Sequence, residues 1–257
     1  MRYKGSKKKK LNIPLNYPLP NLYYFSGNIL KEIRRQSSML VSILNKEGFK
    51  ECHFPFLVPR SILLYYDNLI SLKDFIKVYS GKNPRSYAYL RPDGIFSQGI
   101  ILAGKIIKSH RDLPLKLFEI SPGYTKTRNK DKWNIFTSLE QSFSFQCGVF
   151  TEDNSGEKYC QTLLSTIFNK FSIRFIGNKD IKLLKTRGIQ YVTKINNNKV
   201  IIAKFYNFGQ EVTRRSNIYF FNKKSLSVFP YLCTFSLSQN IFLLNISNNK
   251  KNGRREN

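Results

Sequence analysis

Acidic residues are scarce in this chain of 257 residues, where 16 Asp and Glu stand against 43 Lys and Arg and leave a formal net charge of +27. Self-repulsion of this size disfavours the compact state of a lone globular enzyme. A polyanion would neutralise it, and nucleic acid is the commonest one. The alternative is compositional drift, because an AT-rich genome encodes abundant Lys, Asn, Ile, Phe and Tyr. Drift does not by itself explain why acids are so few, so we favour contact with nucleic acid.

Cysteines are also few, and the four present, Cys52, Cys147, Cys160 and Cys233, form no CxxC pair. Only His53 adjoins one of them, in a segment typical of a buried strand. This scatter argues against a zinc site and against a disulfide framework. We therefore expect reduced, mostly buried thiols, with no metal and no other cofactor.

Long apolar runs are absent: none approaches the ~18 residues of a membrane span, so no membrane partner is expected. The first ten residues are basic but lack the apolar core of a secretory signal and the Arg/Ser-rich amphipathic pattern of an import sequence. The apolar content of 41% is nevertheless enough for a core. The length suits one large domain, with or without a small appendage.

The expected organisation is a basic extended arm (1–22), one domain (23–247) and a basic tail (248–257), with no further domain after it. The arm contains the consecutive cations Lys7, Lys8, Lys9 and Lys10, and three prolines then keep the chain extended. Such a segment is either a solvated tail or an arm that follows phosphates. In the tail, Arg254 and Arg255 are the candidate phosphate contacts.

Residues 109–145 have the pattern of a strand, a long basic loop and a second strand. Apolar residues alternate before Pro122 and Gly123, which should end the first strand. We expect 115–120 and 136–145 to be adjacent antiparallel strands, with Phe143 and Phe145 on one face.

The loop between these strands is a candidate RNA site. It contains one acid, Asp131, and a set of alternating cations: Lys126, Arg128, Lys130 and Lys132. These cations could meet successive phosphates while Trp133 stacks on an exposed base. The alternative is a solvated loop without function.

Hydrophobic periodicity predicts further elements. Helices are expected at 26–46 (closed by Gly48), at 94–108 (with Asp93 as N-cap) and at 157–171, with short helices or turns in 61–79. Strands are expected at 87–90, 189–195, 199–206 and 212–221, and a strand followed by a helix at 229–246. Residues 148–156 should form a loop. Arg214 and Arg215, within the 212–221 strand, are further candidate nucleic-acid contacts.

Several of these segments resemble the class II aminoacyl-tRNA synthetases of the prolyl/threonyl branch. SHRDLPLK at 109–116 is similar to the segment entering motif 2, and GFKECHFPFLVP at 48–59 to motif 1. YLRPDG at 89–94 and the strand and helix at 229–246 resemble other segments of the family, the latter motif 3. The resemblance implies an α+β fold, an antiparallel sheet flanked by helices. It also implies a homodimer through 27–59, although the apolar face there could equally be ordinary core.

The nucleotide-binding residues of the family are missing. Thr125 and Thr127 stand where motif 2 has the Arg for the ATP α-phosphate and the Glu for the adenine, and Thr cannot form the bidentate bonds of Arg. The return strand has Phe136 and Thr137 in place of an Arg–Glu pair, and Asn240 lies in a motif 3 that lacks its Arg. We interpret the adenylation site as lost and expect no catalytic residue.

The expected function is therefore that of an inactive, synthetase-like RNA-binding protein, a structural component of an organellar (mitochondrial) ribosome in contact with rRNA or tRNA and with other ribosomal proteins. Two alternatives stay open: a diverged but active prolyl/threonyl-type synthetase, and an accessory subunit of a mitochondrial DNA polymerase. The expected location is the mitochondrial matrix, otherwise the cytoplasm.

Overall fold

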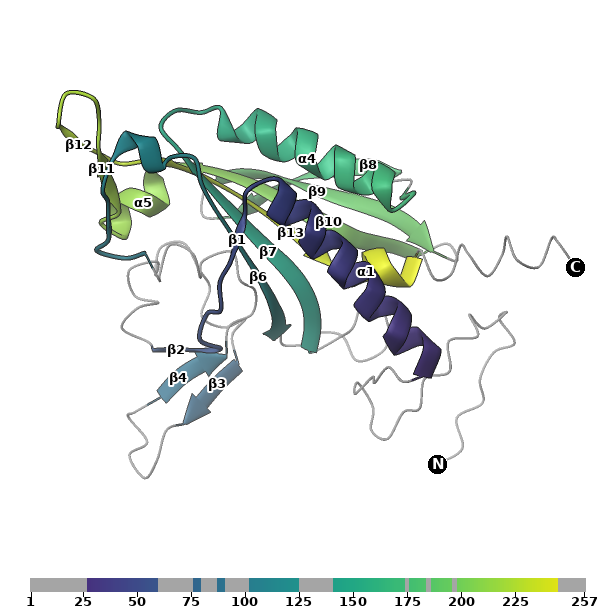
Figure 1. The fold of residues 1–257 in the computed structure, drawn as a ribbon. Coiled ribbons are helices and arrows are strands. Elements are labelled where there is room, and N and C mark those ends of the chain that lie inside the picture. Colours follow the sequence, from purple (N-terminus) through teal and green to yellow (C-terminus); the bar gives the residue numbers. More distant parts are fainter. Residues whose placement is uncertain are drawn as a thin grey trace, which may run out of the picture.

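The structure is a computed structural model that describes residues 27–59, 76–79, 87–90, 102–124, 141–173, 176–183, 186–195 and 198–244. Its centre is a seven-stranded sheet of order β1-β6-β7-β13-β10-β9-β8 (Figure 1). The strands are β1 (Lys50–Glu51), β6 (Leu115–Tyr124), β7 (Gln141–Thr151), β8 (Gly177–Leu183), β9 (Thr186–Ile195), β10 (Asn198–Gly209) and β13 (Tyr231–Ser238). All neighbours pair antiparallel except β1, which runs parallel to β6. The expected α+β fold is confirmed.

Two long helices, α1 (Gly27–Lys46) and α4 (Gly156–Lys170), lie on one face of this sheet (Figure 1). Their apolar positions recur every three or four residues and pack with the inward-facing strand residues into one core. The fully buried members include Leu40 of α1 and Leu164 of α4. Gly48 ends the first helix with φ +81°, a conformation that glycine adopts without strain. Both predicted helices are therefore confirmed.

The central hairpin is confirmed, because β6 and β7 pair antiparallel with Ile120 opposite Phe145. Two of its predicted boundaries are wrong. Pro122 and Gly123 do not end the first strand, since Pro122 still pairs with Phe143. Within the described residues β1 pairs with β6 only as far as Phe118, so Pro122 lies on an edge where a missing donor is tolerated. The predicted 148–156 loop is also wrong as far as Thr151, because β7 continues through it between β6 and β13.

Three other predictions fail because tertiary pairing overrides local pattern. The 212–221 strand is instead a short helix, α5 (Glu211–Arg215), followed by β11 (Tyr219–Phe221). The described end of the 94–108 helix is a turn and β5 (Ile106–Ile107), which pairs in parallel with β11. Ile76, expected in a short helix or turn, begins β3 (Ile76–Tyr79).

The remaining elements complete two small sheets, one of order β12-β11-β5 and one of order β2-β4-β3. They contain β12 (Ser227–Val228), β2 (Leu57–Pro59) and β4 (Tyr87–Leu90), the last as predicted. The predicted β9–β10 hairpin is confirmed, and β8 is an addition to it that the sequence did not indicate. The strand and helix expected at 229–246 are present as β13 and a helical turn over 240–244.

Burial of the thiols is confirmed for Cys147, Cys160 and Cys233, while Cys52 is half-buried. Within the part of the chain that the structure describes, no three His, Cys, Asp or Glu side chains converge in a group that could hold a metal ion. No described helix combines the length and the apolar character that a membrane crossing requires.

Candidate functional site

The face of the main sheet opposite α1 and α4 carries a row of polar side chains. The row crosses six strands in register: Glu119 on β6, Gln146 on β7, Ser236 on β13, Lys204 on β10, Gln190 on β9 and Lys179 on β8. The neighbours of these residues along the strands, such as Phe118, Phe145 and Phe235, point to the helices instead. Because side chains alternate along a strand, the polar row lies on the sheet face that points away from α1 and α4.

The Glu119 end of the row is enclosed by protein. The Glu119 side chain is fully buried, and its Oε1 accepts a hydrogen bond of 3.0 Å from the backbone N–H of Phe54. A second hydrogen bond holds the same two segments together, since the Cys52 N–H donates to the Phe118 carbonyl at 2.8 Å. Burial, and then the charge of Glu119, raises the pKa of the Cys52 thiol. The carboxylate thus anchors the chain after β1 to the sheet.

Beside this row lie two buried hydroxyls, those of Ser121 and Thr234, each on a side chain that is 1% exposed. Neither hydroxyl has a hydrogen-bond partner among the described residues. Buried polar groups are normally satisfied, so these hydroxyls offer hydrogen-bonding capacity. Together with Glu119, Gln146 and Ser236 of the row they form a buried polar layer on this face of the sheet.

Sequence reasoning missed most of this surface, although a signal was present. In both β7 and β13, Ser, Thr or Gln alternates with Phe, Cys or Leu, as in Ser144–Phe145–Gln146–Cys147. That alternation indicates a strand with one apolar and one polar face.

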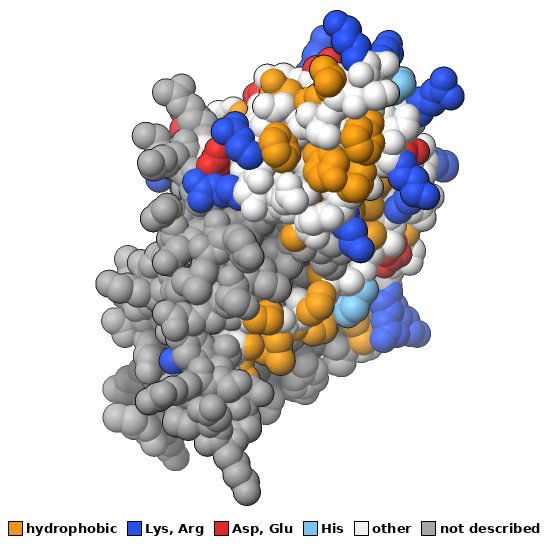
Figure 2. Space-filling model, turned by 90° about the vertical axis from the view of Figure 1, so that its left-hand side faces the viewer, with side chains coloured by type: hydrophobic (Ala, Val, Ile, Leu, Met, Phe, Trp, Pro, Cys, Tyr) orange, Lys and Arg blue, Asp and Glu red, His pale blue; other side chains and the backbone are white. Residues whose placement is uncertain are grey.

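Arg214 and Arg215 lie on α5, at the left of Figure 1, and not on a strand as predicted. Arg214 is exposed, whereas Arg215 forms an ion pair of 2.7 Å with Glu211 one turn earlier. Figure 2 views this side of the molecule, and blue cationic side chains line its edge. Of the two, Arg214 is the residue open to a phosphate.

Asn240 is buried, and its amide nitrogen donates to the Ile201 carbonyl of β10 at 3.0 Å. Its backbone N–H donates to the Ser238 hydroxyl at 3.3 Å. These contacts fasten the start of the last helical turn to the sheet, which is a structural role.

The other predicted site residues lie outside the described part of the chain. These are Lys7, Lys8, Lys9, Lys10, Thr125, Lys126, Thr127, Arg128, Lys130, Lys132, Trp133, Arg254 and Arg255. The structure does bring the residues that flank 125–140 together, because Tyr124 pairs with Gln141.

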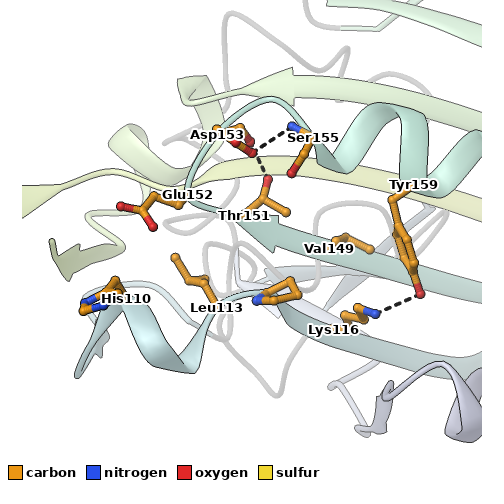
Figure 3. A pocket seen from close by; sticks show the side chains of 10 residues that line it. His110, Leu113, Lys116, Val149, Thr151, Glu152, Asp153, Ser155 and Tyr159 are labelled. Atoms are coloured by element: carbon orange, nitrogen blue, oxygen red, sulfur yellow. Dashed lines mark hydrogen bonds between the residues drawn. The ribbon is translucent and has the colours of Figure 1, made fainter. Parts of the chain in front are cut away.

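A cavity of about 310 Å³ lies at the helix side of β6 and β7 (Figure 3). Its one ammonium group is already held, since Lys116 Nζ donates to the Glu47 carbonyl at 2.8 Å and to the Tyr159 hydroxyl at 3.0 Å. The Tyr159 hydroxyl in turn donates to the Glu47 carboxylate at 2.9 Å. Burial, and then the bond to Glu47, raises the pKa of Tyr159. This cluster joins α1, β6 and α4, and its role is structural.

Comparison with solved structures identifies the architecture. The prolyl-tRNA synthetase of Giardia lamblia in complex with prolyl-adenylate superposes with a TM-score of 0.76 at 18% identity, over 90% of this chain and 49% of that one. The chain has the fold of the prolyl-tRNA synthetases. Two structures of the Cryptosporidium parvum enzyme, with L-proline and AMP and with halofuginone and AMPPNP, give TM-scores of 0.74 and 0.75 at 14% identity. Each match covers 91% of this chain, and 48% and 50% of those chains.

The sequence itself matches no protein-family model and no curated protein. The chain spans about half the length of the synthetases that it resembles. The resemblance inferred from the motifs is therefore confirmed at the level of the class II synthetase fold.

Proposed function

We propose that this chain is a catalytically inactive, synthetase-like protein that binds structured RNA. The observation that carries the proposal is the charge. If every acidic side chain paired with one cation, 27 cations would remain without a carboxylate. A polyanion with regularly spaced phosphates is the partner that meets this requirement.

The ion pairs among the described residues support this interpretation. Arg35 pairs with Glu32 at 2.6 Å and Arg215 pairs with Glu211 at 2.7 Å, in each case within one helix. In such pairs an acidic side chain neutralises a cation of its own helix. The excess cations therefore stay available to an external partner. Phosphate contacts of this kind hold an RNA in position and carry little sequence information.

Two observations support the loss of catalysis. The six residues of the polar row include no arginine, and Asn240 is engaged with the backbone of β10. We further propose that Thr125 and Thr127 leave the motif 2 position without the groups that bind ATP. The chain would then serve as a structural component of an organellar ribosome, with other ribosomal proteins as neighbours, and the 27–59 region remains the proposed homodimer surface.

The test replaces the four cations of the 125–140 loop by serine, K126S/R128S/K130S/K132S, and measures the affinity for a structured rRNA fragment over a range of salt concentrations. We expect weaker binding and a shallower salt dependence, with the slope reduced by up to ~0.7–0.9 per lost phosphate contact. The matched control is K158S/K170S, two exposed cations of α4. Equal affinities and slopes for the loop variant and the wild type would show that RNA does not bind through these four cations.

A second candidate is an active, much diverged synthetase, favoured by the fold and by the buried polar layer that contains Glu119 and Gln146. ATP–pyrophosphate exchange separates the two functions. Amino-acid-dependent exchange by the purified protein would establish the second candidate and would contradict the proposal that the chain is catalytically inactive.

A further inference from the structure

The small sheet β12-β11-β5 has an inner and an outer face. Tyr219 pairs with Ile106 and Phe220 with Ile107, while Phe221 lies opposite Ser227 of β12. Ile107 and Phe220 are buried in the core, but Ile106 and Phe221 are 47% and 37% exposed. Because side chains alternate, the outer face presents Ile106, Tyr219 and Phe221.

This outer face is unusually apolar for a surface. Ile106 and Phe221 are two of the six large hydrophobic side chains that are exposed within the described part of the chain, and a third, Leu226, is 59% exposed in the turn between β11 and β12. Figure 2, which looks at this side, shows a group of orange side chains with more blue than red side chains around it. A gathered apolar patch of this kind marks a binding surface.

The charged side chains within the small sheet and its turns have one sign. Residues 104–108 and 217–228, which form the sheet and its turns, contain no acid and four exposed lysines: Lys105, Lys108, Lys223 and Lys224. The last two lie at the tip of the β11–β12 hairpin, where the Asn222 side chain accepts from the N–H groups of Lys224 at 2.9 Å and Leu226 at 3.0 Å. The tip is thus shaped by its own hydrogen bonds and places two cations within three residues of Phe221.

The exposed aromatic surface and the lysines together identify the occupant. A second copy of this chain would bring the same lysines against each other, which like charges disfavour. Unpaired nucleotides offer both a flat base that stacks on an aromatic ring and a phosphate that meets a lysine. The Tyr219 and Phe221 rings stand 5.9 Å apart at 88°, so the two rings cannot stack on the same base plane.

We propose that the outer face of the β12-β11-β5 sheet binds unpaired nucleotides of RNA. Phe221 stacks on a base, Tyr219 flanks it, and the four lysines contact phosphates. This inference rests on the proposed RNA-binding function and adds to it a second surface, separate from the loop that follows β6.

The experiment uses the full chain and a single-stranded RNA oligonucleotide that carries one 2-aminopurine, whose fluorescence is quenched on stacking. Phe221→Ala should raise Kd by about 5–150-fold, which corresponds to the ~1–3 kcal/mol of one base–aromatic stack, and should remove the quenching. Phe221→Leu should behave like the alanine variant, because it keeps apolar area but lacks a ring. Phe221→Trp should bind as the wild type does. Ile176→Ala, an exposed apolar residue of another region, is the control.

The lysines are tested independently of the ring. K223S/K224S should weaken binding and flatten its salt dependence, whereas K158S/K170S should not. Wild-type affinity in Phe221→Leu, or unchanged binding in K223S/K224S, would overturn the inference, as would a dimer that Phe221→Ala dissociates. If these variants bind normally while the wild type still binds structured RNA, the proposed function stands and this surface does not. A wild type that binds neither RNA overturns both.

Discussion

Gly188 offers a direct test of the pairing between β9 and β10. It lies opposite Tyr206 and is buried beneath it. A Cβ atom at this position would meet the Tyr206 ring and would lie 2.6 Å from the backbone carbonyl oxygen of Phe205. The carbonyl cannot rotate away, so Gly188→Ala must shift the two strands apart and also displace the ring.

Both changes cost stability. The Tyr206 side chain is 5% exposed and stacks on Phe208 with ring centroids 5.8 Å apart, so its displacement exposes buried surface. Overpacking of a close-packed site costs about 1–3 kcal/mol. For a domain of this size that lowers Tm by about 2–12 °C, because each kcal/mol shifts it by about 2–4 °C.

Thermal and urea unfolding of Gly188→Ala and Gly177→Ala provide the measurement. Gly177 is the matched control on β8, since a Cβ there meets nothing within 4 Å. We expect Gly177→Ala to change stability by less than about 1 kcal/mol. In a Tyr206→Ala background, Gly188→Ala should cost less than in the wild type, although the carbonyl contact persists. If the two single glycine variants are equally stable, Tyr206 does not lie over Gly188 and the β9–β10 register is wrong.

Other predictions concern ligands, thiols and pH. ATP should leave Tm unchanged, because a ligand stabilises only through affinity for the folded state, and a saturable rise would show a retained nucleotide site. A thiol reagent at pH 8 should label Cys52 first. Burial raises the pKa of Cys233 to about 12 and that of Cys147 well above its usual value, so both should react later. Early labelling of Cys233 or Cys147 would contradict their burial. Tyr159→Phe should cost about 0.5–1.5 kcal/mol, since the hydroxyl bridges Lys116 and Glu47. Because the folded state raises the pKa of Tyr159, its contribution is complete below pH ~10 and falls above it, and the Phe variant should lose that part of the alkaline decline.

Local pattern predicted the elements whose signals lie within one segment. The helices α1 and α4 follow from apolar spacing and from Gly48, and the β6–β7 and β9–β10 hairpins from alternation on either side of a polar turn. The motif resemblance in 109–116 and 48–59 then identified the fold, which the superposition on prolyl-tRNA synthetases confirms.

The errors occur where a distant strand decides the conformation. Ile106 and Ile107 pair with Tyr219 and Phe220, more than a hundred residues away, so no local pattern indicates β5. The polar row was missed for a related reason. Each member is an ordinary polar residue in its own strand, and only the register across the sheet aligns Glu119, Gln146 and Ser236.

The central claim, that this synthetase-like fold binds structured RNA through its excess cations, is tested most directly by a salt titration of the wild-type protein. The dissociation constant for a structured rRNA fragment is measured across salt concentrations, with duplex DNA as the competing ligand. We expect log K to fall linearly with log salt at a slope that reports several phosphate contacts, with RNA bound more tightly than DNA. Absent binding, a slope near zero, or a preference for duplex DNA would contradict the account.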